Sequence, residues 1–207
     1  MRRLLLATTA LLVLSGAAQA DVVYTSQLNI DHCTGTCGPA GTTFATLTLT
    51  DTDAGMTFSI NPTDGVAFNF NGNAFATFNF STVNPLTLGA FSITTADFQA
   101  VLGDRNQDGF GTFNAGVDHI GNGTSTANLD FSVAGLNFSD LTSSIGGNPS
   151  VFFTVDVLGL NGRTGLIGGD PVMTAVPEAS TWAMMILGFL GVGALGMKKR
   201  GRGFRFA

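Results

Sequence analysis

Apolar and polar residues alternate with a period of two over much of this chain, and this limits the fold more than any other feature. In TFATLTLT, Phe44, Leu47 and Leu49 lie among threonines; DTDAG follows, and MTFSI resumes the alternation. Successive side chains of a strand point to opposite faces, so these residues predict two antiparallel strands joined in a hairpin. VAFNFNG and AFATFNF repeat the pattern with phenylalanine and asparagine.

LDFSVAGLNF and SVFFTVDVLGL predict further strands, separated by loops rich in Gly, Asn, Ser and Thr. Only TTADFQAVLG has a helical period, with Thr95 as its cap and Phe98, Val101 and Leu102 on one face. The pattern predicts an all-β fold, an antiparallel β-sandwich or jelly roll with one short helix. A disordered matrix filler is the alternative, but it does not need so regular a period.

The first twenty residues have the three parts of a secretory signal peptide. Arg2 and Arg3 precede an apolar stretch over 4–14, and the small-x-small triplet 18–20 follows. This pattern predicts export through the secretion translocon and cleavage after Ala20.

Near the other end, the sixteen residues from Trp182 to Met197 contain no charge. As a helix they would reach about 24 Å, a little less than a hydrocarbon core of roughly 30 Å. Trp182 suits one membrane interface, while Lys198, Lys199 and Arg200 can reach the other. A core helix of a soluble domain is usually amphipathic, so this all-apolar run favours a single membrane helix with a basic cytoplasmic tail.

This C-terminal segment resembles the PEP-CTERM sorting signal of exported bacterial proteins, which joins a Pro-Glu-Pro-like motif, an apolar helix and a basic cluster. Ala179 stands where the motif usually has its second proline. The matching residues before the basic block are Val176, Pro177, Glu178, Ser180, Thr181, Trp182, Ala183, Met184, Met185, Gly188 and Phe189.

The resemblance implies that residues 176–207 are read and removed near the motif by an exosortase, a membrane-embedded cysteine transpeptidase. FATLTLTDTDAGMTFSI and PSVFFTVDVLGLNGRTGLIGG also resemble segments found in one group of these proteins. Membership would imply a transient inner-membrane intermediate, then a cell-surface or extracellular location and association with exopolysaccharide in a biofilm matrix.

Residues 21–175 remain, a suitable length for one domain. They contain thirteen aspartates, and their only bases are Arg105 and Arg163, which gives a net charge of −11. This charge argues against nucleic acid as a partner and disfavours anionic membrane surfaces, because binding them relies on Lys and Arg. Cations are better partners for a domain this acidic; residues 21–175 are called the body below.

Cys33 and Cys37 are the only cysteines, and export would place them where disulfides persist. The CxxxC spacing favours a structural disulfide over a redox site, since thioredoxin-like motifs have CxxC. His32 precedes Cys33, but no second cluster completes a zinc site.

The body has two histidines, His32 and His119, and no glutamate. No GxSxG elbow or other constellation selects a nucleophile or an acid–base pair, so the prediction is a non-enzymatic protein with no catalytic residue. A secreted hydrolase acting on matrix polysaccharide, with a pair of aspartates, is the alternative.

The most specific local motif is DRNQDGFG, in which Asp104, Asn106 and Asp108 recur at every second position before Gly109. Oxygen ligands at this spacing are typical of a calcium loop, to which Phe110 could add its carbonyl. Position 12 is Ala115 rather than the glutamate of an EF-hand. A solvated turn explains the same residues equally well, and both interpretations stay open.

Overall fold

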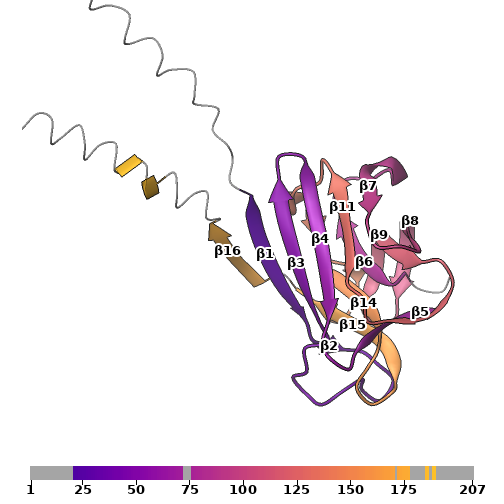
Figure 1. Ribbon diagram of the computed structural model, residues 1–207. Helices are drawn as coiled ribbons and strands as arrows, with labels where there is room; N and C mark the ends of the chain where they lie inside the picture. The colour runs from indigo at the N-terminus through magenta and orange to yellow at the C-terminus, as the bar shows by residue number, and fades with distance from the viewer. Residues whose placement is uncertain (1–20, 72–75, 171, 178–184, 187, 190–207) are drawn as a thin grey trace, which may run out of the picture.

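The computed structural model describes residues 21–71, 76–170, 172–177, 185–186 and 188–189. These residues form two antiparallel sheets, which confirms the all-β, antiparallel prediction (Figure 1). The six-stranded sheet A has the order β16-β1-β3-β4-β11-β7. Its strands are β1 Val22–Leu28, β3 Ala45–Thr52, β4 Gly55–Pro62, β7 Phe91–Ile93, β11 Leu129–Ala134 and β16 Val172–Pro177.

The ten-stranded sheet B runs β10-β5-β14-β6-β9-β13. In addition, β15 joins β14 to β2, β8 pairs with β9, and β12 pairs with β6. Its strands are β2 Ile30–Asp31, β5 Ala67–Asn71, β6 Phe78–Thr82, β8 Phe98–Gln107, β9 Gly111–His119, β10 Asn122–Ser125, β12 Leu141–Thr142, β13 Ile145–Gly146, β14 Phe153–Leu158 and β15 Thr164–Gly169.

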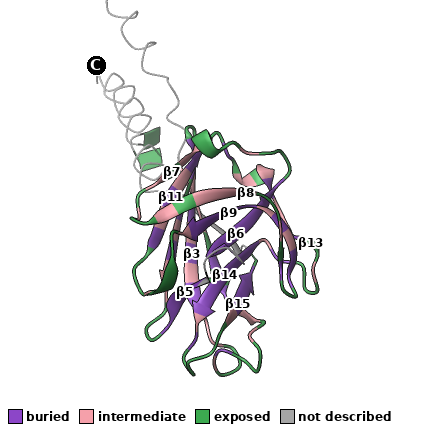
Figure 2. Ribbon diagram, turned by 90° about the vertical axis from the view of Figure 1, so that its right-hand side faces the viewer, coloured by how far each residue is buried: buried purple, intermediate pink, exposed green. Residues whose placement is uncertain are grey.

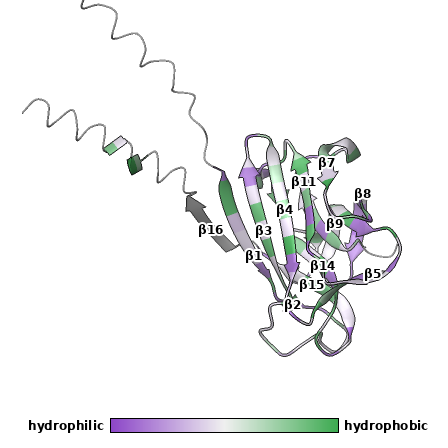
Figure 3. Cartoon of the chain, viewed as in Figure 1, coloured by the Kyte–Doolittle hydropathy of each residue, from purple (hydrophilic) through white to green (hydrophobic). Residues whose placement is uncertain are grey.

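The predicted hairpin over residues 44–60 is β3 and β4, with Leu49 opposite Phe58. Figure 3 shows the alternating hydropathy along these strands. Leu47, Leu49 and Phe58 are buried, whereas the threonines between them reach the outer surface. The remaining predicted strands are β5, β6, β11 and β14, so the two-residue period identified each of these elements correctly.

An aromatic cluster joins the two sheets. Phe58 of sheet A stacks on Phe131, with ring centroids 4.5 Å apart, and lies 5.1 Å from Phe80 of sheet B. Phe78 and Phe153 continue the cluster within sheet B. All five side chains are at most 3% exposed, and Figure 2 shows buried residues along the strands of both layers.

The predicted helix around Thr95 to Leu102 is wrong. Phe98–Gln107 is strand β8, paired along β9 from Phe98 opposite His119. The Thr95 hydroxyl does not cap a helix but donates to the Asn128 carbonyl and accepts from the Asp130 N–H. Asp97 has φ 64°, in the left-handed region, which a continuous right-handed helix cannot contain. In residues 21–71 and 76–170, helical elements are limited to the 3₁₀ turns Leu88–Ala90 and Phe138–Asp140.

Both boundaries of the predicted domain lie at one edge of sheet A. Strand β16 pairs antiparallel with β1, with Val176 opposite Val23 and Pro177 opposite Val22. Figure 1 shows the two strands side by side. The sheet therefore continues two residues beyond the predicted domain end at 175 and includes the first residues of the predicted sorting motif.

Candidate functional site

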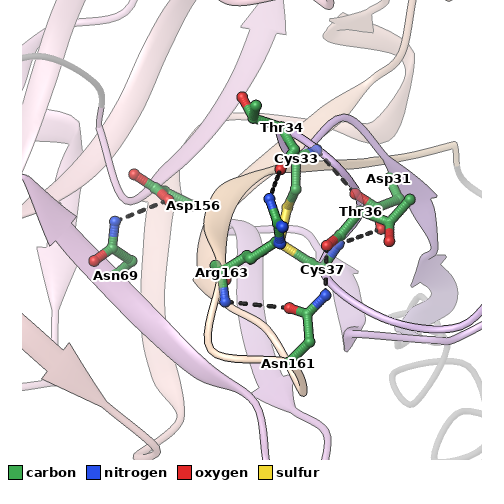
Figure 4. The surroundings of a disulfide bond; sticks show 9 residues. All are labelled: Asp31, Cys33, Thr34, Thr36, Cys37, Asn69, Asp156, Asn161 and Arg163. Atoms are coloured by element: carbon green, nitrogen blue, oxygen red, sulfur yellow. Dashed lines mark hydrogen bonds between the residues drawn. A yellow bond between two sulfur atoms is a disulfide. The ribbon is translucent and has the colours of Figure 1, made fainter.

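The disulfide loop follows β2 and forms one wall of a polar cleft. Cys33 and Cys37 are disulfide-bonded with their Cα atoms 5.5 Å apart, which confirms the predicted disulfide (Figure 4). The Asp31 carboxylate accepts hydrogen bonds from the backbone N–H groups of Cys33 (2.8 Å) and Cys37 (2.7 Å). Within the described residues, Asp31, Cys33 and Cys37 form the one group of three or more His, Cys, Asp or Glu residues whose potential metal-binding atoms all lie within 4.8 Å of one another. The sulfurs are bonded to each other rather than ionised, so this group stabilises the loop.

The connection between β14 and β15 holds this loop in place. Asn161 Nδ2 donates to the Thr36 carbonyl (2.7 Å), and one Arg163 guanidinium nitrogen donates to the Thr34 carbonyl (2.8 Å). Figure 4 shows both side chains reaching the loop. Arg163, one of the two basic residues of the body, therefore helps to hold the disulfide loop in place.

The turn between β8 and β9 folds over the outer face of sheet B. Gln107 Nε2 donates to Asn79 Oδ1 on β6 (3.2 Å). Phe110 packs on Gly168 of β15, where an added Cβ would lie 2.6 Å from the ring. His32 lies against Phe110, with centroids 4.7 Å apart, and occupies the space that a Cβ at Gly109 would need. Two glycines thus allow the turn to approach the sheet and the disulfide loop.

A cleft of about 190 Å³ lies between this turn, the disulfide loop and strands β14 and β15. Asp156 of β14 is 2% exposed, and its Oδ1 accepts a hydrogen bond from Asn69 Nδ2 of β5 (3.1 Å), drawn in Figure 4. Asp108, at the turn, is exposed. The polar residues that line the cleft are His32, Thr34, Asp108, Asp156 and Thr164.

The spacing of these groups favours a ligand larger than one ion. His32, Asp108 and Asp156 are not among the described groups whose donor atoms all lie within 4.8 Å of one another. A bound calcium ion needs its oxygen ligands at about 2.3–2.6 Å from the ion. A molecule with several polar groups can instead contact carboxylate, imidazole and hydroxyl groups across the cleft.

The predicted calcium ligands are spread along a strand and its turn. Asp104 and Asn106 belong to β8, and Asp108 follows it, so alternate residues lie roughly 6.6 Å apart along the extended chain. All three side chains are exposed. The carbonyl of Phe110, which is buried, accepts a hydrogen bond from Ser144 Oγ (2.5 Å). The segment does not wrap around one point as an EF-hand loop does.

Calcium binding by Asp104, Asn106, Asp108 and Phe110 stays a prediction. Without the position-12 glutamate, we expect a dissociation constant of about 0.1 to 1 mM and a calcium-dependent rise in melting temperature. Calorimetric titration of the Asp104→Ala, Asp108→Ala variant should show the binding heat lost. An Asp53→Ala, Asp64→Ala variant removes two acids elsewhere and should keep it. Equal heats in all three proteins would contradict a calcium site.

The outer face of sheet A carries a second polar feature, a row of hydroxyls across four strands. Thr50 of β3 lies opposite Thr57 of β4, Thr57 opposite Ser132 of β11, and Ser132 opposite Ser92 of β7. Strands are about 4.7–4.9 Å apart, so this row is about 14 Å long. Thr57 and Ser92 are exposed and Thr50 and Ser132 are half-buried, and among the described residues no side-chain hydrogen bond engages these four hydroxyls.

A parallel row contains Thr48, Ser59 and Asp130. Ser59 Oγ donates to Asp130 Oδ1 (2.6 Å), which orients the carboxylate on this face. A shallow groove of about 240 Å³ runs over both rows. We name the surface formed by Thr48, Thr50, Thr57, Ser59, Ser92, Asp130 and Ser132 the hydroxyl face.

The other predicted site residues lie at the chain ends. Val176 and Pro177 are in β16. The signal-cleavage residue Ala20 and the remaining sorting residues Glu178, Trp182, Lys198, Lys199 and Arg200 lie outside the described residues. Within the residues that the structure describes, no helix has the length and apolarity to span a bilayer.

Sequence reasoning missed Asp156, Asn69 and Thr164. Asn69 and Asp156 are 87 residues apart and meet because β14 pairs with β5. The spacing of residues along the chain carries no signal for such a contact. Comparison with protein-family models, curated proteins and solved structures finds no match for this chain. The chemistry of both sites must therefore be inferred from their own residues.

Proposed function

We propose that this chain is an exported, non-enzymatic protein of the cell surface or extracellular matrix that associates with exopolysaccharide. The signal-peptide pattern of residues 1–20 and the PEP-CTERM-like segment 176–207 support export and sorting. An exosortase-type enzyme and the secretion translocon are its processing partners, and the inner membrane holds it only transiently.

The hydroxyl face is the observation that carries the polysaccharide part of the proposal. Its serine and threonine hydroxyls both donate and accept hydrogen bonds, as the hydroxyls of a sugar chain do. Each such bond contributes only about 0.5–1.5 kcal/mol after exchange with water. A row registered over four strands offers several at once and would bind an extended sugar chain along its length.

Removing hydroxyls from this face is expected to weaken retention on polysaccharide. The variant Thr50→Val, Thr57→Val keeps the β-branched shape and deletes two hydrogen-bonding groups. We expect about a tenfold loss of affinity for exopolysaccharide purified from the producing bacterium. Co-sedimentation of the exported protein with the polysaccharide measures it.

Thr124→Val is the matched control, because Thr124 is an exposed strand residue of β10 in the other sheet. It should be retained like the unaltered protein. Equal retention of all three proteins would reject the hydroxyl face as the binding surface.

A secreted polysaccharide hydrolase is the second candidate, since Asp108 and Asp156 line one cleft. Glycosidases commonly use two carboxyl groups, one as acid and the other as base or nucleophile. Release of reducing ends from the purified exopolysaccharide, abolished by Asp156→Asn and by Asp108→Asn, would favour this candidate. No release over a long incubation would favour the non-enzymatic function.

A further inference from the structure

We propose that the cleft between the β8–β9 turn and the disulfide loop binds a single sugar unit that carries a protonated amine. The inference rests on the proposed function for the source of such a sugar, an amine-bearing polysaccharide. It names a site separate from the hydroxyl face, which lies on the opposite sheet.

The charge of the cleft determines the kind of sugar. Two of its lining residues are aspartates, and Asp156 is 2% exposed, so water screens its field less than that of a surface acid. The body has two basic residues in all. Neither Arg105 nor Arg163 is among the residues that line the cleft. A cationic group is therefore the complementary partner.

The size and spacing of the cleft select a sugar unit over a bare ion. A cleft of about 190 Å³ is far larger than a site for one ion needs to be and leaves room for one sugar ring. The donor atoms of His32, Asp108 and Asp156 do not all lie within 4.8 Å of one another, so they do not form a compact metal site. A ring can place its ammonium group near the carboxylates while its hydroxyls contact Thr34 and Thr164.

The walls of the cleft are already in place before a ligand binds. Asp156 lies in β14 between β15 and the strands β5 and β6, and Asn69 holds one of its oxygens. The disulfide and the Arg163 hydrogen bond hold the loop that contributes Thr34. Contact between His32 and Phe110 joins this loop to the turn that carries Asp108. Such preorganisation lowers the entropy cost of binding.

Calorimetric titration of the exported protein with glucosamine and N-acetylglucosamine tests the proposal, because the two share a ring and differ in the charge of one nitrogen. At low ionic strength and neutral pH, glucosamine should bind at least about tenfold more tightly. Asp108→Asn, an exposed change that should leave folding intact, should reduce glucosamine affinity about tenfold. Asp156→Asn should do the same, provided that its unfolding transition matches that of the unaltered protein.

Asp64→Asn, at an exposed position away from the cleft, is the control and should bind glucosamine normally. Equal affinity for both sugars, no binding of either, or equal losses in Asp64→Asn and Asp108→Asn would each overturn the proposal. Loss of glucosamine binding when calcium is added, absent in the Asp104→Ala variant, would identify a cation site at the turn instead. Polysaccharide retention through Thr50 and Thr57 is measured separately, so either proposal can fail without the other.

Discussion

Replacing Phe58 with alanine should lower the free energy of unfolding by about 3–5 kcal/mol, the usual loss for a large aromatic side chain removed from a core. Phe58 is 1% exposed and lies at the junction of the two sheets. It stacks on Phe131 within sheet A and contacts Phe80 of sheet B. The cavity would therefore open where the layers meet, and the loss should appear as a lower denaturant midpoint with little change in slope.

Two variants calibrate this prediction. Phe58→Leu keeps an apolar side chain in the space and should cost distinctly less. Ile145→Ala removes an apolar side chain that is 76% exposed, and it should change stability by no more than about 0.5 kcal/mol. A loss in Phe58→Ala as small as that of Ile145→Ala would mean that the aromatic cluster does not hold the sheets together.

The sequence predicts those strands in which burial of one face alone determines the alternation of apolar and polar residues. Leu47, Leu49 and Phe58 alternate with threonines because one face of sheet A is buried and the other meets solvent. The same alternation that identifies the strands also creates the hydroxyl face, because the threonines between the buried residues face outward in register. That face could be anticipated strand by strand, but its rows depend on which strands are neighbours.

The short segment after Thr95 was predicted wrongly because its apolar residues fit two periods. Phe98, Val101 and Leu102 fit one helical face, while Phe98, Ala100 and Leu102 fit one strand face. Pairing with β9 decides between them, since it gives Phe98 to Leu102 a partner strand in continuous register. A single sequence does not reveal the partner strand.

The residues that line the cleft could not be predicted either, because a single sequence does not reveal which distant segments are neighbours. His32, Asp108 and Asp156 come from three distant segments, and they meet only because β15 pairs with both β2 and β14 and the β8–β9 turn folds over that region. Asp108 was selected as part of a calcium motif, and the structure places it beside two residues outside that motif. The tertiary contacts, rather than the local spacing, assign its neighbours.

Processing at both ends should have the largest effect on the covalent state of the protein. We expect the intact mass of the exported chain to correspond to a start at Asp21 and to loss of the apolar segment from Trp182 onward. Because Val22 and Val23 pair with Pro177 and Val176, we also expect the mature chain to retain β16 and to end beyond Pro177. Exported material that still ends in MKKRGRGFRFA would contradict this processing.

Replacing Pro177 and Glu178 with alanine should leave the protein in the inner membrane, because the motif that the sorting enzyme reads would be lost while the apolar segment remains. Pro177 has no N–H to donate to the sheet, so its replacement removes no ladder hydrogen bond and should not unfold β16. Pro62→Ala changes the proline that ends β4 and is the matched control, expected to be processed normally. Membrane fractionation with intact-mass measurement separates the outcomes. Normal release of the double variant would show that Pro177 and Glu178 are not the recognition element. Retention of the double variant in the membrane, together with normal release of Pro62→Ala, would assign recognition to these two residues.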